Sequence, residues 1–104
     1  MNLRELLDRE VAELPGAVAV IGPDRSMTWT RNDRPFATVT ADGSTAEFAL
    51  DPAIASAATR TPDVSLSNRG PGWVKFAPTD LDDHAADRAR AWLASAHRRL
   101  ELRN

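Results

Sequence analysis

Residues 68–76 read Asn68-Arg69-Gly70-Pro71-Gly72-Trp73-Val74-Lys75-Phe76. The Gly-Pro-Gly segment is typical of a turn, and the four residues after it alternate in character as a strand does. Val74 and Phe76 form the apolar pair that a core would take, so Trp73 and Lys75 are expected on the other face. The stretch therefore predicts a hairpin that presents an aromatic ring and a cation together.

The remaining helices and strands follow from hydrophobic periodicity. Apolar residues recur at helical spacing near both ends of the chain, and short apolar or alternating runs lie between them. Turn residues separate these runs. The expected helices are residues 3–14, 52–60 and from Thr79 or Asp80 to Leu100, and the expected strands are residues 17–21, 27–31, 35–40, 45–50, 64–66 and 73–77.

Capping residues mark the helix ends. Asn2 and Glu5 form a capping-box pair, and Asp51 followed by Pro52 supplies an acceptor and a residue suited to the first helical turn. Thr79 or Asp80 is expected to cap the final helix. That helix carries acidic residues early and basic residues late, which complements its dipole; the late ones are Arg98, Arg99 and Arg103.

The order of elements is α-ββββ-α-ββ-α, which predicts an α+β fold. Hairpin-connected strands between terminal helices favour a mainly antiparallel sheet with those two helices packed on one face. No linker divides the chain, so residues 1–104 are expected to form a single domain. The other face of the sheet is expected to be open.

The composition excludes several classes of protein. Of the 104 residues, 42% are apolar and 27% are charged, with a net charge of −2, as in an ordinary soluble globular domain. There is no cysteine, so disulfides, thiolate chemistry and cysteine zinc sites are ruled out. The first residues show no signal-peptide pattern, and no apolar run approaches the roughly 18 residues of a membrane span. We therefore expect a cytoplasmic protein that does not enter membranes.

A binding surface on the open face has six candidate residues, which are Trp29, Arg31, Arg34, Arg69, Trp73 and Lys75. Aromatic and arginine side chains are enriched in recognition surfaces, and cations stack on aromatic rings. The alternation of residues 27–31 leaves open whether Trp29 shares this face. In the alternative interpretation, Trp29 belongs to the core, the stem of Lys75 half-covers Trp73, and the arginines are simply solvated.

Histidines and acidic residues form no recognisable metal or catalytic site. His84 lies with Asp80 and Asp87 on one helical face, but a metal ion would need another donor from elsewhere. His97 points to the opposite side of that helix. No serine is suitably spaced from a histidine, and a strand follows the 70–72 turn where a phosphate loop would need a helix. We expect no metal, no cofactor and no enzymatic activity.

Several motifs match a known family over nearly the whole chain. They are Leu14-Pro15-Gly16-Ala17, Arg34-Pro35-Phe36-Ala37-Thr38-Val39, Phe48-Ala49-Leu50-Asp51-Pro52, Gly72-Trp73-Val74 and Ala91-Trp92. In these motifs the chain resembles the MmcQ/YjbR-like proteins, which are a bacterial family of uncharacterised function. It also resembles a rival group, the luciferase-like domain family, in Asp42-Gly43-Ser44 and again in Gly72-Trp73-Val74. Ser95-Ala96-His97 departs from both, where a Ser-Tyr pair is often seen.

The first resemblance implies a fold similar to that of CyaY, the bacterial frataxin. It implies no known cofactor, and a sheet surface that has been suggested to bind DNA. Frataxins use acidic residues of the first helix for iron. Here Arg4 and Arg9 pair with Asp8 and Glu13 at helical spacing, which neutralises the field that iron would need. We therefore expect no iron site.

The sequence predicts a binding module, monomeric or weakly homodimeric. Its open sheet face, centred on Trp73 and Lys75, is expected to engage a protein or a small anionic ligand. The alternative function is DNA binding through the same face, with Arg31, Arg34, Arg69 and Lys75 on phosphates. The pI near 5.6 argues against a dedicated nucleic-acid binder.

Overall fold

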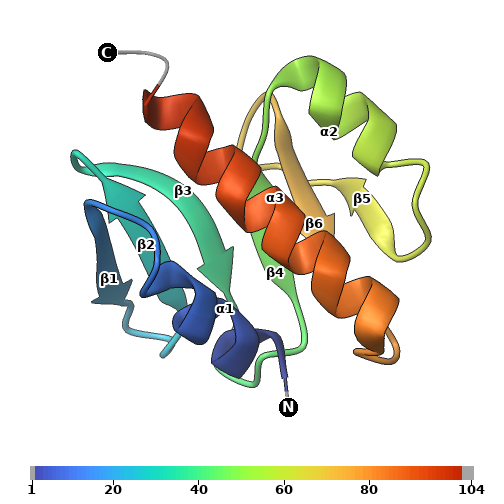
Figure 1. The fold of residues 1–104 in the computed structure, drawn as a ribbon. Coiled ribbons are helices and arrows are strands. Elements are labelled where there is room, and N and C mark those ends of the chain that lie inside the picture. The colour runs from blue at the N-terminus through green and yellow to red at the C-terminus, as the bar shows by residue number, and fades with distance from the viewer. Residues whose placement is uncertain (1, 102–104) are drawn as a thin grey trace.

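A computed structural model describes residues 2–101 and confirms the α+β fold (Figure 1). Within these residues the elements follow the predicted order, and each strand begins and ends within one residue of its expected bounds. The helices are α1 (Leu3–Val11), α2 (Pro52–Ala58) and α3 (Asp83–Glu101). The strands are β1 (Ala17–Ile21), β2 (Met27–Arg31), β3 (Arg34–Val39), β4 (Ala46–Ala49), β5 (Val64–Leu66) and β6 (Trp73–Phe76).

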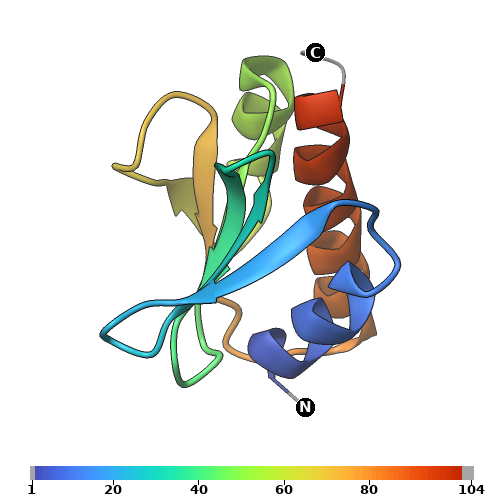
Figure 2. The ribbon, with the colours of Figure 1, turned by 90° about the vertical axis from the view of Figure 1, so that its left-hand side faces the viewer.

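The strands form one antiparallel sheet in the order β1-β2-β3-β4-β6-β5. The first four strands form a meander, and the β5–β6 hairpin joins it because β6 pairs with β4. All three helices lie on one face of this sheet, and α3 crosses it (Figure 2). Within residues 2–101 the opposite face, which we call the open face, carries no helix.

The core lies between the sheet and the helices. An apolar stripe of α3 is buried, and the phenylalanines of three strands face it with at most 1% exposure. The half-buried ring of Trp92 meets the ring of Phe76 edge-on, with centroids 5.1 Å apart. Full burial of a large apolar side chain contributes about 1.5–3 kcal/mol, so these contacts hold α3 on the sheet. The buried residues of the stripe are Ala85, Ala89, Leu93, Ala96 and Leu100.

An irregularity in β3 departs from simple alternation. Trp29 lies opposite Ala37 and Thr30 lies opposite Pro35, so Phe36 has no partner on β2. A bulge of this kind re-aims a side chain. As a result, Phe36 and Ala37 are both fully buried although they are neighbours. The Phe36 ring meets the His97 ring of α3 edge-on at 5.5 Å.

Three helix ends differ from the prediction, and one of them is the end of α2, at Ala58 instead of residue 60. α1 begins as expected, with the Asn2 side chain accepting the Glu5 N–H at 2.9 Å, but it ends at Val11 instead of residue 14. α3 begins at Asp83, because the Asp82 carboxylate accepts the Ala85 N–H at 2.8 Å. The predicted cap at Thr79 or Asp80 is therefore wrong. Arg103, expected near the end of this helix, lies outside the described residues.

The start of α2 is also capped differently from the prediction. Pro52 occupies the first turn as expected, but the Asp51 side chain makes no capping hydrogen bond. Its Oδ1 instead lies 3.9 Å from Nε of Arg99 on α3. The Asp51 carbonyl still accepts the Ala55 N–H at 2.8 Å, so the backbone begins the helix while the carboxylate turns toward α3.

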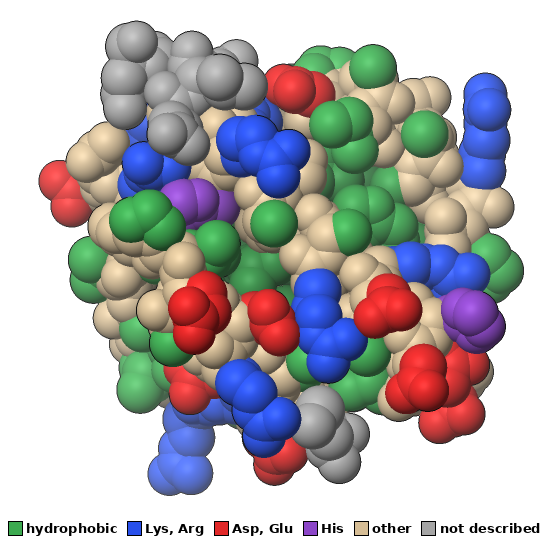
Figure 3. Space-filling view, in the orientation of Figure 1, with side chains coloured by type: hydrophobic (Ala, Val, Ile, Leu, Met, Phe, Trp, Pro, Cys, Tyr) green, Lys and Arg blue, Asp and Glu red, His purple; other side chains and the backbone are tan. Residues whose placement is uncertain are grey.

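Charges of both signs are interspersed on the helix-covered face (Figure 3). Arg90 of α3 pairs with Glu10 of α1 at 3.1 Å and with Asp87 at 3.0 Å. Exposed pairs of this kind contribute about 0–1 kcal/mol each, so the core and not the ion pairs joins the helices. Among residues 2–101, no helix has the length and apolar character needed to cross a membrane.

Candidate functional site

Alternation along β6 places Trp73 and Lys75 on the open face. Val74 and Phe76 are 0% and 1% exposed beneath the helices, whereas Trp73 is partly exposed and Lys75 is exposed. Across the ladder to β4, Lys75 lies opposite Glu47. This strand therefore presents its aromatic ring and its cation as the sequence predicts.

The turn before β6 determines where Trp73 lies. The Trp73 N–H bonds to the Gly70 carbonyl at 3.2 Å, and the Ser67 N–H bonds to the Trp73 carbonyl at 2.9 Å. Gly72 has φ of 83°, and a Cβ at this position would collide with the Leu50 carbonyl oxygen. The turn is thus pressed against the end of β4, and only glycine fits there.

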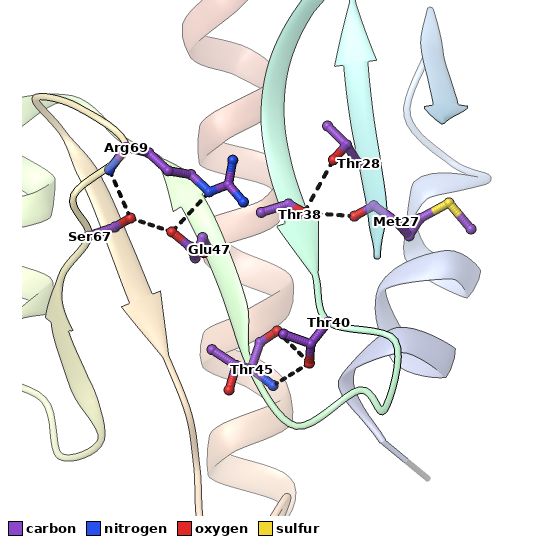
Figure 4. A network of polar contacts seen from close by, with 8 residues as sticks. All are labelled: Met27, Thr28, Thr38, Thr40, Thr45, Glu47, Ser67 and Arg69. Atoms are coloured by element: carbon purple, nitrogen blue, oxygen red, sulfur yellow. Dashed lines mark hydrogen bonds and ion pairs between the residues drawn. The ribbon is translucent and has the colours of Figure 1, made fainter. Parts of the chain in front are cut away.

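A polar cluster surrounds Trp73. The Arg69 guanidinium carbon lies 5.7 Å from the centre of the Trp73 ring, and Arg69 Nε lies 3.0 Å from Glu47 Oε2. Ser67 Oγ donates a hydrogen bond to the same carboxylate and accepts one from the Arg69 N–H (Figure 4). We call Glu47, Ser67, Arg69, Trp73 and Lys75 the Trp73 surface.

Glu47 fixes the geometry of this surface. Its side chain is only 16% exposed, whereas that of Arg69 is 47% exposed. A carboxylate so shielded requires polar partners, and Arg69 and Ser67 supply them. Arg69 is therefore held over the Trp73 ring while its side chain stays partly exposed.

Trp29 does not belong to this surface. It is 0% exposed on the helix-covered face, so the interpretation that assigns it to the core is correct. Its neighbours Thr28 and Thr30 take the open face, because alternation allows only one set to face the helices. The indole Nε1 of Trp29 is buried without a hydrogen-bond partner among the described residues.

Arg31 and Arg34 also lie away from the Trp73 surface. Arg31 lies two residues after Trp29 on β2, so its side chain points to the same, helix-covered face of the sheet. Its NH1 donates to the His97 carbonyl of α3 at 3.3 Å. Arg34 is exposed and pairs in register with Arg31 at the end of the β2–β3 hairpin. Of the six candidate residues, the structure therefore brings together only Arg69, Trp73 and Lys75.

The sequence reasoning missed Glu47 and Ser67. Glu47 stands between Ala46 and Phe48, which are both buried. A lone carboxylate inside an alternating apolar strand must face the other side of the sheet, and that signal could have placed it on the open face. Ser67 gives no such signal, since serine is common in any turn.

The rest of the open face is mostly threonine and valine. The buried hydroxyl of Thr38 donates to the Met27 carbonyl at 2.9 Å and lies 3.2 Å from the hydroxyl of Thr28 (Figure 4). Val18 and Val20 extend this apolar part to the edge of the sheet, where they are more than half exposed. Charge on the open face is thus concentrated near β4 and β6.

The described residues show no enclosed site. No pocket is found in the part of the chain from Asn2 to Glu101. Nor does that part contain a group of three or more His, Asp or Glu residues placed to hold a metal ion. The Trp73 surface offers a ring, a guanidinium over that ring, an ammonium and a shielded carboxylate. These groups suit the binding of a partner on an open surface instead of a ligand in a pocket.

No protein-family model matches the chain, and no curated protein matches its sequence.

Proposed function

We propose that this protein is a binding module that engages another protein through the Trp73 surface. The observation that carries the proposal is Arg69, which stacks on Trp73 while Glu47 holds it in place. Tryptophan and arginine are the residues that most often dominate binding energy at protein interfaces. A fixed arrangement of the two side chains lowers the entropy lost on association.

The charges favour a protein partner over a small anion. Arg69 already pairs with Glu47, and Lys75 lies opposite Glu47 in the β4–β6 ladder. An anion would therefore meet a locally balanced surface. A protein can instead cover the ring and match both signs of charge.

We also propose a cytoplasmic location for this protein. We further propose that it belongs to the MmcQ/YjbR-like family, with the luciferase-like domain family as the rival assignment.

A peptide library displayed on phage tests the proposal. It would be panned against the wild-type protein, and the selected peptides measured by calorimetry against two variants. Trp73→Ala should weaken binding by about 2 kcal/mol or more, as for a central interface residue. Arg34→Ala is the matched control, because it removes an exposed arginine outside the Trp73 surface and should leave affinity unchanged. Equal affinity of wild type and Trp73→Ala would overturn the proposal.

DNA binding through the open face has less support. Arg31 and Arg34 lie on the helix side, which leaves Arg69 and Lys75 beside the carboxylate of Glu47. Phosphate contacts would make affinity fall steeply with added salt. A labelled duplex titrated at low salt distinguishes the two functions: binding that falls with salt and is lost in Lys75→Ala would favour DNA over a protein partner.

A further inference from the structure

The outer edge of β1 is apolar and uncovered. In Figure 2, β1 is the strand nearest the viewer, with no other element in front of it. Val18, Val20 and Ile21 are 57%, 51% and 62% exposed. Residues 16–22 contain no charge and no proline, and β1 pairs with β2 without a bulge. Sheets normally protect an edge with a charge, a proline or a bulge, and this edge has none of them.

Backbone hydrogen bonding shows which groups face outward. The Gly22 N–H bonds to the Ser26 carbonyl at 2.9 Å, and in an antiparallel ladder bonded pairs recur at every second residue. Val18 and Val20 therefore bond to β2, whereas Ala19 and Ile21 direct their N–H and C=O groups away from it. The edge thus carries a row of donors and acceptors.

The opposite edge of the sheet is short by comparison. β5 has three residues, and the N–H of Val64 is already bonded to the Thr61 carbonyl at 3.3 Å. Only Leu66 directs both backbone groups outward, because Ser65 bonds to Lys75 of β6. β1 is therefore the edge that offers a strand of useful length.

We propose that β1 is the interface of a homodimer, in which the β1 strands of two copies pair antiparallel about a twofold axis at Ala19. In this register, Ala19 bonds to Ala19 of the second copy, and the Ile21 N–H bonds to the Ala17 carbonyl. Val18 meets Val20 of the other copy on the open face. Such an interface is self-complementary, and it joins the two sheets into one.

Charge complementarity favours this antiparallel pairing over a parallel one. Pairing about Ala19 brings the β1–β2 loop of each copy, with the exposed Arg25, beside the α1–β1 turn of the other, with the exposed Glu13. The nearby Asp24 carboxylate is occupied by the Ser26 N–H at 3.1 Å and by its hydroxyl at 2.7 Å. A parallel pairing would instead set Arg25 beside Arg25. Opposite charges therefore favour the twofold arrangement.

The dimer is expected to be weak. One strand pair buries less than the roughly 1,200 Å² of a stable interface, so association depends on protein concentration. Along the sheet, β2, β3 and β4 lie between the proposed interface at β1 and the strand β6 that carries Trp73. The dimer can therefore be tested independently of the binding function.

Sedimentation equilibrium with charge-swap variants tests the proposal. The wild type should move from the 11.3 kDa monomer toward twice that mass as concentration rises. Val18→Lys with Val20→Lys sets like charges opposite each other and should weaken dimerisation about tenfold or more. Val18→Lys with Val20→Glu has the same number of charged substitutions but pairs opposite signs across the axis, and should dimerise. A monomeric wild type, or equal dimerisation of both variants, would overturn the proposal.

Amide hydrogen exchange tests the same register without any substitution. The Ala19 and Ile21 amides should exchange rapidly in dilute protein and slow down as concentration rises. The Val18 and Val20 amides are bonded to β2 and should stay protected throughout. Concentration-dependent protection at residues 64–66 or 67–73 in place of β1 would contradict the proposal, because the contact would then lie elsewhere.

Discussion

Gly72 is the residue on which the position of Trp73 depends most directly. Its carbonyl accepts the Leu50 N–H at 2.9 Å, and its own Cα faces the Leu50 carbonyl without room for a Cβ. Its positive φ adds a second requirement for glycine. Glycine is therefore the one residue type compatible with position 72, where the turn that carries Arg69 meets the end of β4.

Gly72→Ala should lower the free energy of unfolding by about 2 kcal/mol or more, through backbone strain and the clash together. Gly16→Ala is the matched control, since Gly16 has φ of 76° but its Cβ would meet nothing closer than 3.8 Å. Urea denaturation of both variants gives the comparison. If Gly72→Ala costs no more than Gly16→Ala, the close approach to Leu50 does not constrain the turn.

Asp42 is the residue whose ionisation the fold changes most clearly. The Ser44 N–H and the hydroxyls of Thr40 and Ser44 donate to its carboxylate at 3.0, 2.7 and 2.8 Å. These bonds lower the pKa of Asp42 from 3.8 to about 2. The turn between β3 and β4 is therefore organised around the ionised carboxylate.

A carboxylate whose pKa is lowered by folding stabilises the folded protein. This contribution is complete at pH values above the pKa in the unfolded chain, and it is lost as pH falls through the pKa in the folded protein. The wild type should thus be more stable than Asp42→Asn at neutral pH, and the difference in Tm should shrink between pH 3.8 and about 2. Thermal unfolding followed across this range gives the result. A difference that stays constant down to pH 2 would contradict the lowered pKa.

At the scale of elements, Asp82 decides where α3 begins. Three residues of the 79–82 segment could cap a helix, and they are Thr79, Asp80 and Asp82. The fourth residue, Leu81, packs against the core before the helix starts. Leu81 therefore packs outside the helix, and the chain enters the helix only after it. Asp82 then accepts the Ala85 N–H.

Asp82→Ala should cost about 1 kcal/mol of stability, the usual effect of removing a cap. Asp80→Ala removes the carboxylate that the sequence favoured, and should change stability by about 0.5 kcal/mol or less, as for an ordinary surface position. Chemical denaturation of both proteins measures the difference. A larger loss in Asp80→Ala would mean that the helix begins earlier than Asp83.

Strands were predicted more accurately than helix ends, for a physical reason. Alternation and turn residues fix a strand on both sides, so β1, β2 and β5 match their expected bounds. A helix end depends on which of several polar side chains reaches the backbone. Asp51 illustrates this, because its carboxylate is near Arg99 and leaves the cap to the main chain.

At the scale of the molecule, the division of the sheet into two faces decides what is available for binding. Trp73 and Lys75 could be assigned from one strand, because Val74 and Phe76 compete for the core. Parity alone left Trp29 open, although residues 27–31 offer no apolar pair on the opposite parity that could compete with Met27 and Trp29 for the core. Packing under the helices settled it, and it also drew Arg31 toward His97.

Acrylamide quenching of tryptophan fluorescence in Trp92→Phe tests this division most directly, because only Trp29 and Trp73 then emit. The buried Trp29 and the partly exposed Trp73 predict two populations, one blue-shifted and protected, the other red-shifted and quenched. Adding Trp73→Phe should remove the quenched population alone. A single protected population, or loss of the blue-shifted one on adding Trp73→Phe, would contradict the assignment of Trp73 to an open binding face.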